Sequence, residues 1–249
     1  MHNPFSLEGK TILITGASSG IGRATAIECS KLGANVILSG RNEEHLAETK
    51  NSLLCLNGQK HKSIIADLTD EIQIKNLVEC VDCIDGLVNN AGVNRVKPIN
   101  FIKMEDLDYI FHSNTFSSVS LTKMLVKKKK IKNGGSIVFT SSVSAFYNAP
   151  GRALYASSKS ALTSFMRSFA IELAEKRIRA NAVHPGMIET GFIKENLSEE
   201  ELKKNISEYP LKRFGKPEEI AWAIIYLLSD ASSWITGSSL TIDGGFMLK

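Results

Sequence analysis

The sequence predicts an α/β fold with a doubly wound, seven-stranded parallel sheet flanked by helices. Three observations predict it. Short β-rich runs alternate with helical patterns, a glycine-rich turn directly follows the first run, and no linker, repeat or low-complexity tract interrupts this order. We therefore expect residues 1–249 to form one domain.

Seven short runs of apolar and β-branched residues are the expected strands. They are Thr11–Thr15, Asn35–Ser39, Ser63–Ala66, Ile84–Val88, Ser136–Thr140, Arg179–Val183 and Ser239–Ile242. The expected helices are Ile21–Leu32, Glu43–Leu54, Asp70–Cys80, Met104–Lys130, Leu154–Glu175, Glu199–Asn205 and Pro217–Leu228. Gly33 is the expected C-cap of the first helix, and Gly134 and Gly135 are expected to end the fourth. This alternation is typical of parallel βαβ units.

The charge balance is mildly basic. The chain has 30 Lys and Arg residues and 26 Asp and Glu residues, a formal net charge of +4, which is too small to indicate a nucleic-acid partner. No run of about 18 uncharged apolar residues predicts a membrane span, and Met1–Lys10 lacks the apolar core of a signal peptide. We expect a cytoplasmic protein without a membrane or nucleic-acid partner.

The four cysteines fit a reducing compartment; they are Cys29, Cys55, Cys80 and Cys83. Cys80 and Cys83 form a single CxxC pair, but a structural zinc site needs two more ligands at similar spacing, and none is nearby. No metal site is expected. Packing as small apolar side chains is the favoured interpretation of the pair, and a redox role stays open.

The first predicted strand runs into the turn Thr15–Gly22, with the spacing GxxxGxG. Gly16, Gly20 and Gly22 allow positive φ angles and a close approach of the backbone to a ligand. The helix that begins there presents free N–H groups and the positive end of its dipole, which suit a pyrophosphate. Because the turn lies in the first βα unit, it predicts nucleotide binding.

The end of the second predicted strand reads Ser39-Gly40-Arg41-Asn42. An NAD-binding protein typically has an acidic residue there for the ribose 2′-hydroxyl. Here the acid is absent, and the guanidinium of Arg41 suits a 2′-phosphate. The sequence therefore favours NADP(H), while a solvated Arg41 without a ligand role remains the alternative.

Tyr155 and Lys159 are four residues apart on a predicted helix and share one of its faces. A tyrosine pKa of about 10 is high for proton transfer at neutral pH, and a neighbouring cation lowers it. Polar or glycine-containing turns also follow several strands, with Asp67, Asn89–Gly92, Ser141 and Ser142, and Pro185 and Gly186. Because the carboxyl ends of parallel strands meet at one sheet edge, we expect these groups to share a crevice.

In these motifs the sequence resembles the short-chain dehydrogenase/reductase family, which has a Rossmann fold. The matching elements are the turn Thr15–Gly22, NNAG at Asn89–Gly92, Asn114, Ser142 placed 13 residues before Tyr155, YxxxK at Tyr155–Lys159, and Pro185-Gly186. They extend over almost the entire chain.

The resemblance implies a role for each matching residue. Tyr155 is the acid or base, Lys159 lowers its pKa and holds the nicotinamide ribose, Ser142 orients the substrate oxygen, and Asn114 supports a water that links Lys159 to solvent. Asp67 meets the adenine, and Thr190 contacts the nicotinamide amide or the diphosphate. The expected cofactor-binding residues are Gly16, Ser18, Ser19, Gly20, Ile21, Gly22, Arg41, Asp67, Leu68, Asn89, Ala91, Gly92, Tyr155, Lys159, Pro185, Gly186, Ile188 and Thr190.

Several of these residues have a purely structural alternative. Asn114 can cap or kink its helix, and Thr190 can be a helix N-cap. His184 is expected to make ordinary hydrogen bonds at a strand end. Tyr109 and Tyr147 lack a lysine four residues later and are poor candidates for the acid.

The resemblance implies hydride transfer between NADP(H) and a small-molecule carbonyl or alcohol. The favoured activity is that of a 3-oxoacyl-[acyl-carrier-protein] reductase. The alternative is a dehydrogenase of a sugar, polyol, steroid or other secondary alcohol. A dinucleotide-binding sensor or scaffold is disfavoured because Ser142, Tyr155 and Lys159 are all retained. Residues 187–211 are expected to cover the substrate with an apolar face made by Met187, Ile188, Phe192, Ile193 and Leu197.

Two partner predictions complete this picture. Arg167, Lys176 and Arg177 are candidates to meet an acidic carrier protein, with solvated helix charge as the favoured interpretation. The long helices and the last strand are expected to build a homotetramer, and a dimer stays open.

Overall fold

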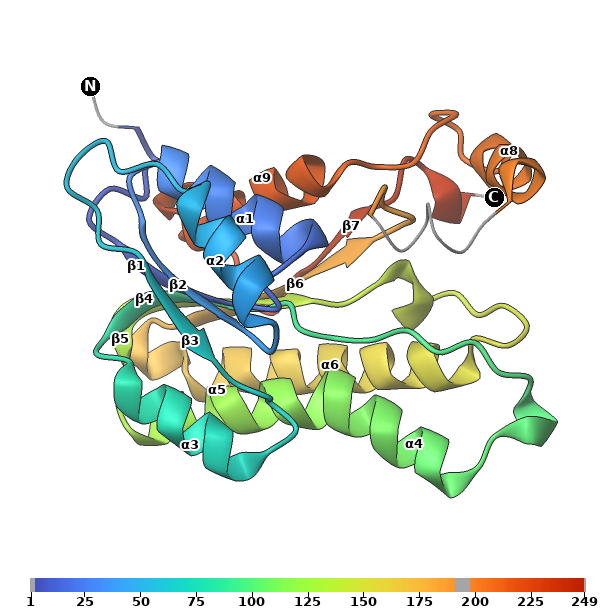
Figure 1. Ribbon diagram of the computed structural model, residues 1–249, viewed down its shortest axis with the longest axis horizontal. Coiled ribbons are helices and arrows are strands. Elements are labelled where there is room, and N and C mark those ends of the chain that lie inside the picture. The colour runs from blue at the N-terminus through green and yellow to red at the C-terminus, as the bar shows by residue number, and fades with distance from the viewer. Residues whose placement is uncertain (1–2, 191–197, 249) are drawn as a thin grey trace.

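The computed structural model describes residues 3–190 and 198–248. Its centre is a seven-stranded sheet in the order β3-β2-β1-β4-β5-β6-β7, in which every neighbouring pair is parallel (Figure 1). The strands are β1 Thr11–Thr15, β2 Asn35–Gly40, β3 Lys62–Ile65, β4 Ile84–Asn89, β5 Ile131–Thr140, β6 Arg179–Pro185 and β7 Ser239–Ile242. The predicted fold class is confirmed.

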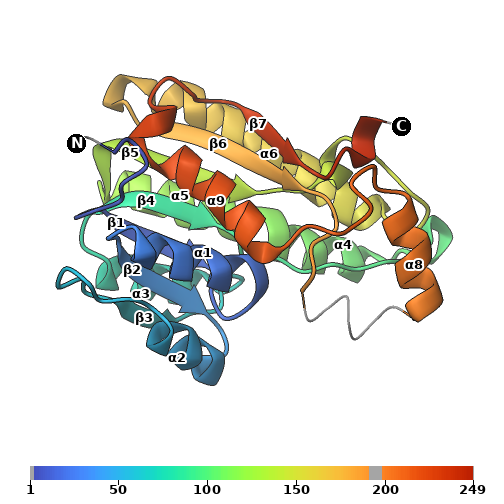
Figure 2. The ribbon, with the colours of Figure 1, turned by 90° about the horizontal axis from the view of Figure 1, so that it is seen from above.

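Helices cover both faces of the sheet, as Figures 1 and 2 show. One face carries α1 Gly20–Lys31, α2 Glu43–Asn51 and α9 Pro217–Leu228. The opposite face carries α3 Glu71–Cys80, α4 Met104–Phe111, α5 Ser117–Lys127 and α6 Ala153–Glu172. Helix α8, Glu199–Ser207, stands beyond the carboxyl ends of the strands, close to the C-terminus (Figure 2).

Alternation along the strands divides the buried apolar side chains between two cores. In β1, Ile12 and Ile14 belong to the core beneath α1 and α9, whereas Leu13 belongs to the core beneath α3, α5 and α6. All three are fully buried. A parallel sheet covered on both faces requires such continuous apolar strands, and the rigid double core holds the strand ends in fixed positions.

The predicted helix Met104–Lys130 is interrupted and ends earlier. A π-helical turn, His112–Phe116, separates α4 from α5, and α5 ends at Lys127 because Lys129 takes a left-handed φ of +54°. Gly134 and Gly135 do not end a helix, since both lie inside β5, where the pairing with β4 shifts register. An extra residue in a helical turn redirects the side chains beside it, and such turns are frequent at functional sites.

Two absences concern the described residues only. None of their helices is both long enough and apolar enough to cross a membrane. Within residues 3–190 and 198–248, no three His, Cys, Asp or Glu side chains are grouped so that they could hold a metal ion. Cys29 is buried, whereas Cys55, Cys80 and Cys83 are exposed and unpaired thiols.

Candidate active site

A cleft of about 1040 Å³ opens at the carboxyl ends of the strands. Its walls contain the residues that follow β1, β2, β3, β4, β5 and β6, together with residues of α6 and of the segment after β6. In the sheet order, β1 lies between β2 and β4, so the chain reverses its direction of winding there. Open α/β sheets bind their ligands in the crevice at this switch point.

The glycine-rich turn on one side of the cleft depends on its glycines. Gly16 has a φ of +63°, and a Cβ there would lie 2.9 Å from Ala91 Cα. A Cβ on Gly22 would lie 2.2 Å from Gly16 O. A side chain on Gly16 would push the turn away from the segment that follows β4, and one on Gly22 would push α1 away from the turn, so glycine is required at both positions for close packing.

Helix α1 begins at this turn and presents free hydrogen-bond donors. Its N-cap, Ser19, makes no side-chain cap bond, and its first turn has no acidic residue. The backbone N–H groups of Gly20, Ile21 and Gly22 have no hydrogen-bond partner among the described residues. Ser18, Ser19, Gly20 and Ile21 line the cleft. A pyrophosphate fits this donor set and the positive end of the helix dipole.

Asn90 ties the ends of β1 and β4 together. Its side-chain amide donates to Thr15 O at 3.2 Å and to Gly16 O at 3.3 Å, and its backbone N–H donates to Thr15 Oγ1 at 2.9 Å. Ala91 N also donates to Thr15 Oγ1, at 3.1 Å. The floor of the cleft is therefore cross-linked by hydrogen bonds.

The structure places Asn89 away from the cleft. Its side chain is buried and donates to Thr122 Oγ1 at 2.9 Å. The cleft is lined instead by Asn90, Ala91 and Gly92. The difference arises because side chains alternate along β4, so consecutive asparagines point to opposite sides.

Arg41 and Asp67 face each other at the far end of the cleft. The guanidinium lies 3.9 Å from the Asp67 carboxylate and is 63% exposed. Asp67 also accepts hydrogen bonds from the backbone N–H and the hydroxyl of Thr69, at 2.9 and 2.8 Å. Leu68 lines this end, as does His45, which the sequence pattern does not single out. The carboxylate is held in place while the arginine remains accessible.

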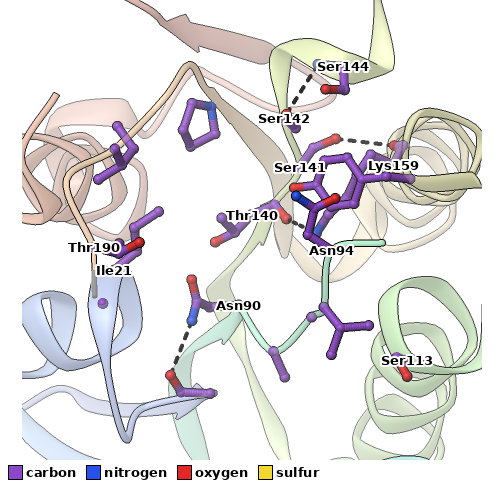
Figure 3. A pocket seen from close by; sticks show the side chains of 18 of the residues that line it. Ile21, Asn90, Asn94, Ser113, Thr140, Ser141, Ser142, Ser144, Lys159 and Thr190 are labelled. Atoms are coloured by element: carbon purple, nitrogen blue, oxygen red, sulfur yellow. Dashed lines mark hydrogen bonds between the residues drawn. The ribbon is translucent and has the colours of Figure 1, made fainter. Parts of the chain in front are cut away.

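Lys159 is buried beneath the cleft, with 4% of its surface exposed. Its ammonium donates to Thr140 O at 2.8 Å (Figure 3) and lies 5.7 Å from the centre of the Tyr155 ring. Burial lowers the pKa of Lys159 from 10.5 to about 8, because removal from water penalises the charged form. The lysine keeps its charge at neutral pH and loses it within the mildly alkaline range.

Tyr155 is half-buried on α6 and lines the cleft together with Ser142. Burial raises the pKa of its phenol above the ordinary 10, while the Ser142 hydrogen bond and the charge of Arg152 act in the lowering direction. The expected net lowering by Lys159 is therefore not what the structure shows. Removing the phenolate from water outweighs the favourable contacts, so this tyrosine is protonated at neutral pH.

The two serines at the end of β5 point in different directions. Ser142 lines the cleft and accepts a hydrogen bond from Ser144 N at 3.1 Å (Figure 3). Ser141 donates to Lys159 O at 3.1 Å and thereby ties β5 to α6. His184 Nδ1 donates to Ser142 O at 2.9 Å, and its ring stacks on Phe146 with centroids 4.5 Å apart. His184 thus makes the expected strand-end hydrogen bond through Nδ1, while its buried Nε2 has no hydrogen-bond partner among the described residues.

Asn114 is fully buried in the π-helical turn. Its side chain accepts from Val93 N at 2.7 Å and donates to Val93 O at 2.9 Å and to Ser158 Oγ at 3.0 Å. A Cβ on Gly92 would lie 3.0 Å from Asn114 Oδ1 and 3.3 Å from Lys159 Nζ. Gly92 therefore keeps the space between the amide and the ammonium clear.

The segment after β6 forms the opposite wall. Pro185, Gly186, Ile188 and Thr190 all line the cleft. Gly186 N donates to Ile242 O at 3.0 Å, which pins the turn to β7. Thr190 stands next to Gly20, since its Cγ2 would lie 3.3 Å from a Cβ on that glycine. Phe192, Ile193 and Leu197, part of the expected apolar face over the substrate, lie outside the described residues.

Comparison with known proteins identifies the family. Residues 16–247 match a family model described as Enoyl-(Acyl carrier protein) reductase. A 3-oxoacyl-[acyl-carrier-protein] reductase FabG of Thermotoga maritima is 42% identical over 246 residues, covering 97% of this chain and 99% of that protein. The chain belongs to the short-chain dehydrogenase/reductase family. As a member of it, the chain is an oxidoreductase that uses a nicotinamide dinucleotide.

Other members are similar over the same length. A glucose 1-dehydrogenase of Gluconobacter oxydans is 37% identical over 247 residues, covering 96% of this chain and 92% of that protein. The structure of a short-chain type dehydrogenase/reductase from Mycobacterium ulcerans superposes with a TM-score of 0.91 at 31% identity, covering 98% of this chain and 92% of that one. These likenesses fix the family and leave several substrate classes open.

The structure adds residues to the cleft that the sequence motifs do not single out. On the side of Tyr155 they are Asn94, Ser113, Ser144, Tyr147, Arg152, Tyr209 and Phe246. Tyr209 is buried, its hydroxyl accepts from Met187 N at 2.9 Å, and its ring stacks on Phe246. Arg152 has a sequence signal, since it precedes Tyr155 by three residues and so shares its helix face.

Proposed function

We propose that this short-chain dehydrogenase/reductase is an NADP(H)-dependent reductase that converts a carbonyl to an alcohol, with Tyr155 as the acid. The observation that carries the proposal is the placement of Tyr155 and Ser142 together on the cleft wall, with the Lys159 ammonium buried beside the Tyr155 ring. A protonated phenol and a serine hydroxyl together make a two-donor site for one carbonyl oxygen.

Ser142, Tyr155 and Lys159 would each have a separate role in the reduction of the carbonyl group. When bound, the nicotinamide cofactor supplies the hydride that the carbonyl carbon receives. Ser142 and Tyr155 hold the carbonyl oxygen, and Tyr155 transfers its proton to that oxygen as negative charge develops there. Because the pKa of Tyr155 is raised above 10, the phenol carries its proton at neutral pH and can act as the acid. The Lys159 ammonium stabilises the phenolate that remains.

Resupply of the proton is the role we assign to Lys159 and Asn114. With a pKa of about 8, Lys159 exchanges its proton readily near neutral pH. Asn114 Oδ1 and Lys159 Nζ both lie close to Gly92, around one small space. Asn114 holds Val93 through two hydrogen bonds. It would also hold a water in this space, which makes it a positioning residue rather than a catalytic one.

The N-terminus of α1, together with Ser18, Ser19 and Ile21, would hold the pyrophosphate of the cofactor. The rest of the cofactor site would be lined by Leu68, Ala91, Pro185, Gly186, Ile188 and Thr190. We propose NADP(H) rather than NAD(H) because Arg41 follows β2, where an NAD-specific site has a carboxylate. Its exposed guanidinium can leave Asp67, 3.9 Å away, for a 2′-phosphate.

We propose a 3-oxoacyl group as the substrate, since the full-length likeness to the Thermotoga maritima reductase supports it. The likeness to a glucose 1-dehydrogenase supports a sugar as the second candidate.

We propose that the whole chain forms one catalytic domain, in which residues 187–211 cover the substrate. Exposed aromatic side chains, among them Phe165 on α6 and Trp234 before β7, support a homotetramer.

A screen of NADPH oxidation tests the function. The purified protein is supplied with NADPH and with 3-oxoacyl thioesters, keto-sugars or cyclic ketones, and the loss of NADPH absorbance is followed. We expect turnover with 3-oxoacyl thioesters. Turnover with keto-sugars alone would favour the second candidate, and no turnover with any carbonyl compound would contradict the proposal.

A further inference from the structure

Arg152 is a cation in the active-site cleft that the reaction described above does not use. It lies at the N-cap position of α6, three residues before Tyr155, and lines the cleft with its side chain half-buried. Its charge lowers the pKa of Tyr155, against the larger raising effect of burial, and acts in the same lowering direction on Tyr209. The guanidinium therefore lies within electrostatic reach of the reacting phenol.

The guanidinium of Arg152 has no partner within the described part of the chain. No carboxylate of residues 3–190 and 198–248 lies within 4.0 Å of it, and it donates no side-chain hydrogen bond there. The other two cations of the cleft wall differ, because Arg41 lies against Asp67 and Lys159 donates to Thr140 O. The guanidinium of Arg152 is therefore free to bind an anionic group in the cleft.

The acidic side chains near this end of the cleft do not form an ion pair with Arg152. Asp243 is occupied by its own turn, accepting from Gly245 N at 3.0 Å and from Met247 N at 2.9 Å. Glu208 is exposed and forms no ion pair with the arginine. The first turn of α6 contains no acidic residue either. None of these carboxylates is paired with Arg152 among the described residues.

The backbone that carries Arg152 is fixed before any ligand binds. Gly151 has a φ of +76°, and its carbonyl accepts from Lys97 N at 2.9 Å. Arg152 N donates to Ala149 O at 3.0 Å, and Ala156 N donates back to Arg152 O at 2.9 Å. A site whose backbone is already ordered loses less entropy on binding.

We propose that Arg152 is a specificity-determining residue that binds an anionic oxygen group of the substrate, a carboxylate or a phosphate, within a few bonds of the reacting carbonyl. This inference rests on the proposed carbonyl reduction at Tyr155 and narrows its substrate class. Among 3-oxoacyl compounds it favours the free 3-oxo acid, whose carboxylate carbon lies two bonds from the ketone carbon, over a neutral thioester. The planar guanidinium matches either anion with two parallel hydrogen bonds.

Matched substrates test the proposal with NADPH and the intact protein. The carboxylate arm compares acetoacetate with methyl acetoacetate and with the N-acetylcysteamine thioester of acetoacetate, and the phosphate arm compares hydroxyacetone phosphate with hydroxyacetone. We expect kcat/KM for one anion to exceed that for its neutral counterpart by about 10- to 100-fold, the range of a charge-assisted hydrogen bond. Arg152→Gln should bring that ratio close to one, mainly through KM.

A control variant removes a positive charge elsewhere. Lys50→Gln, on the exposed end of α2, should leave the ratio unchanged. A wild-type ratio of one or below in both arms overturns the proposal, as does a ratio that Arg152→Gln does not alter.

Binding without turnover separates this inference from the proposed function. Acetoacetate is titrated calorimetrically into the protein saturated with NADP⁺, which has no hydride to give. Binding that weakens at least tenfold in Arg152→Gln supports the role of Arg152 even if no ketone is reduced. Ketone reduction without any dependence on charge leaves the proposed function standing and overturns the role of Arg152.

Discussion

Replacing Lys159 with Met should stabilise the protein while removing its activity. The fall of the Lys159 pKa from 10.5 to about 8 corresponds to about 3 kcal/mol of destabilisation from burying the ammonium, at 1.36 kcal/mol per pH unit. Methionine has a similar length and carries no charge. It leaves Thr140 O without the 2.8 Å hydrogen bond, and this loss destabilises the variant by about 1 to 2 kcal/mol. The net gain expected for Lys159→Met is about 1 to 2 kcal/mol.

The gain should depend on pH with a definite sign. Below about pH 8 the lysine is charged in both states, and the folded protein bears the full penalty. Between about pH 8 and 10.5 the unfolded chain binds the proton that the folded protein has released, so wild-type stability rises with pH. Lys159→Met lacks this rise. The advantage of the variant should therefore shrink across this interval.

Urea unfolding followed by circular dichroism measures both effects. The two proteins are compared at one subunit concentration at pH 7 and at pH 9.5, with Lys50→Met as a surface control. At pH 7 we also expect the melting temperature of Lys159→Met to rise by about 2 to 8 °C. A variant less stable than wild type at pH 7, or a difference that stays constant with pH, would refute the electrostatic reasoning.

Two further predictions concern the cofactor site. Arg41→Ala should raise KM for NADPH by about tenfold or more and leave KM for NADH nearly unchanged, because only the first carries a 2′-phosphate; steady-state kinetics with both cofactors checks this, and equal changes would remove Arg41 from phosphate recognition. Gly22→Ala should weaken NADPH binding, measured by fluorescence titration, and lower the melting temperature, because its Cβ would lie 2.2 Å from Gly16 O and 2.6 Å from Asn90 Nδ2. Wild-type affinity and stability in that variant would mean that the turn can relax.

Local sequence patterns were enough to predict the parallel sheet and the main motifs of the site. Apolar runs such as Thr11–Thr15 are continuous because a parallel sheet is buried on both faces. Helical spacing also places Tyr155 and Lys159 on one face of α6, and the structure brings both to the same cleft as Ser142.

Features that depend on tertiary contacts could not be predicted in this way. The π-helical turn at His112–Phe116 accompanies buried hydrogen bonds of Asn114 to Val93 and Ser158, which lie far from it in sequence. The contrast between Asn89 and Asn90 depends on which strand face is buried. The upward shift of the Tyr155 pKa arises from desolvation, which a YxxxK motif does not encode.

The central claim is that Tyr155 gives its proton to the substrate oxygen, and Tyr155→Phe tests it most directly. Phenylalanine keeps the ring and removes only the hydroxyl. With NADPH and a 3-oxoacyl thioester, we expect kcat to fall by about 10²- to 10⁴-fold, while the Kd for NADPH, measured by fluorescence, changes less than about threefold. Undiminished turnover in Tyr155→Phe would contradict the account.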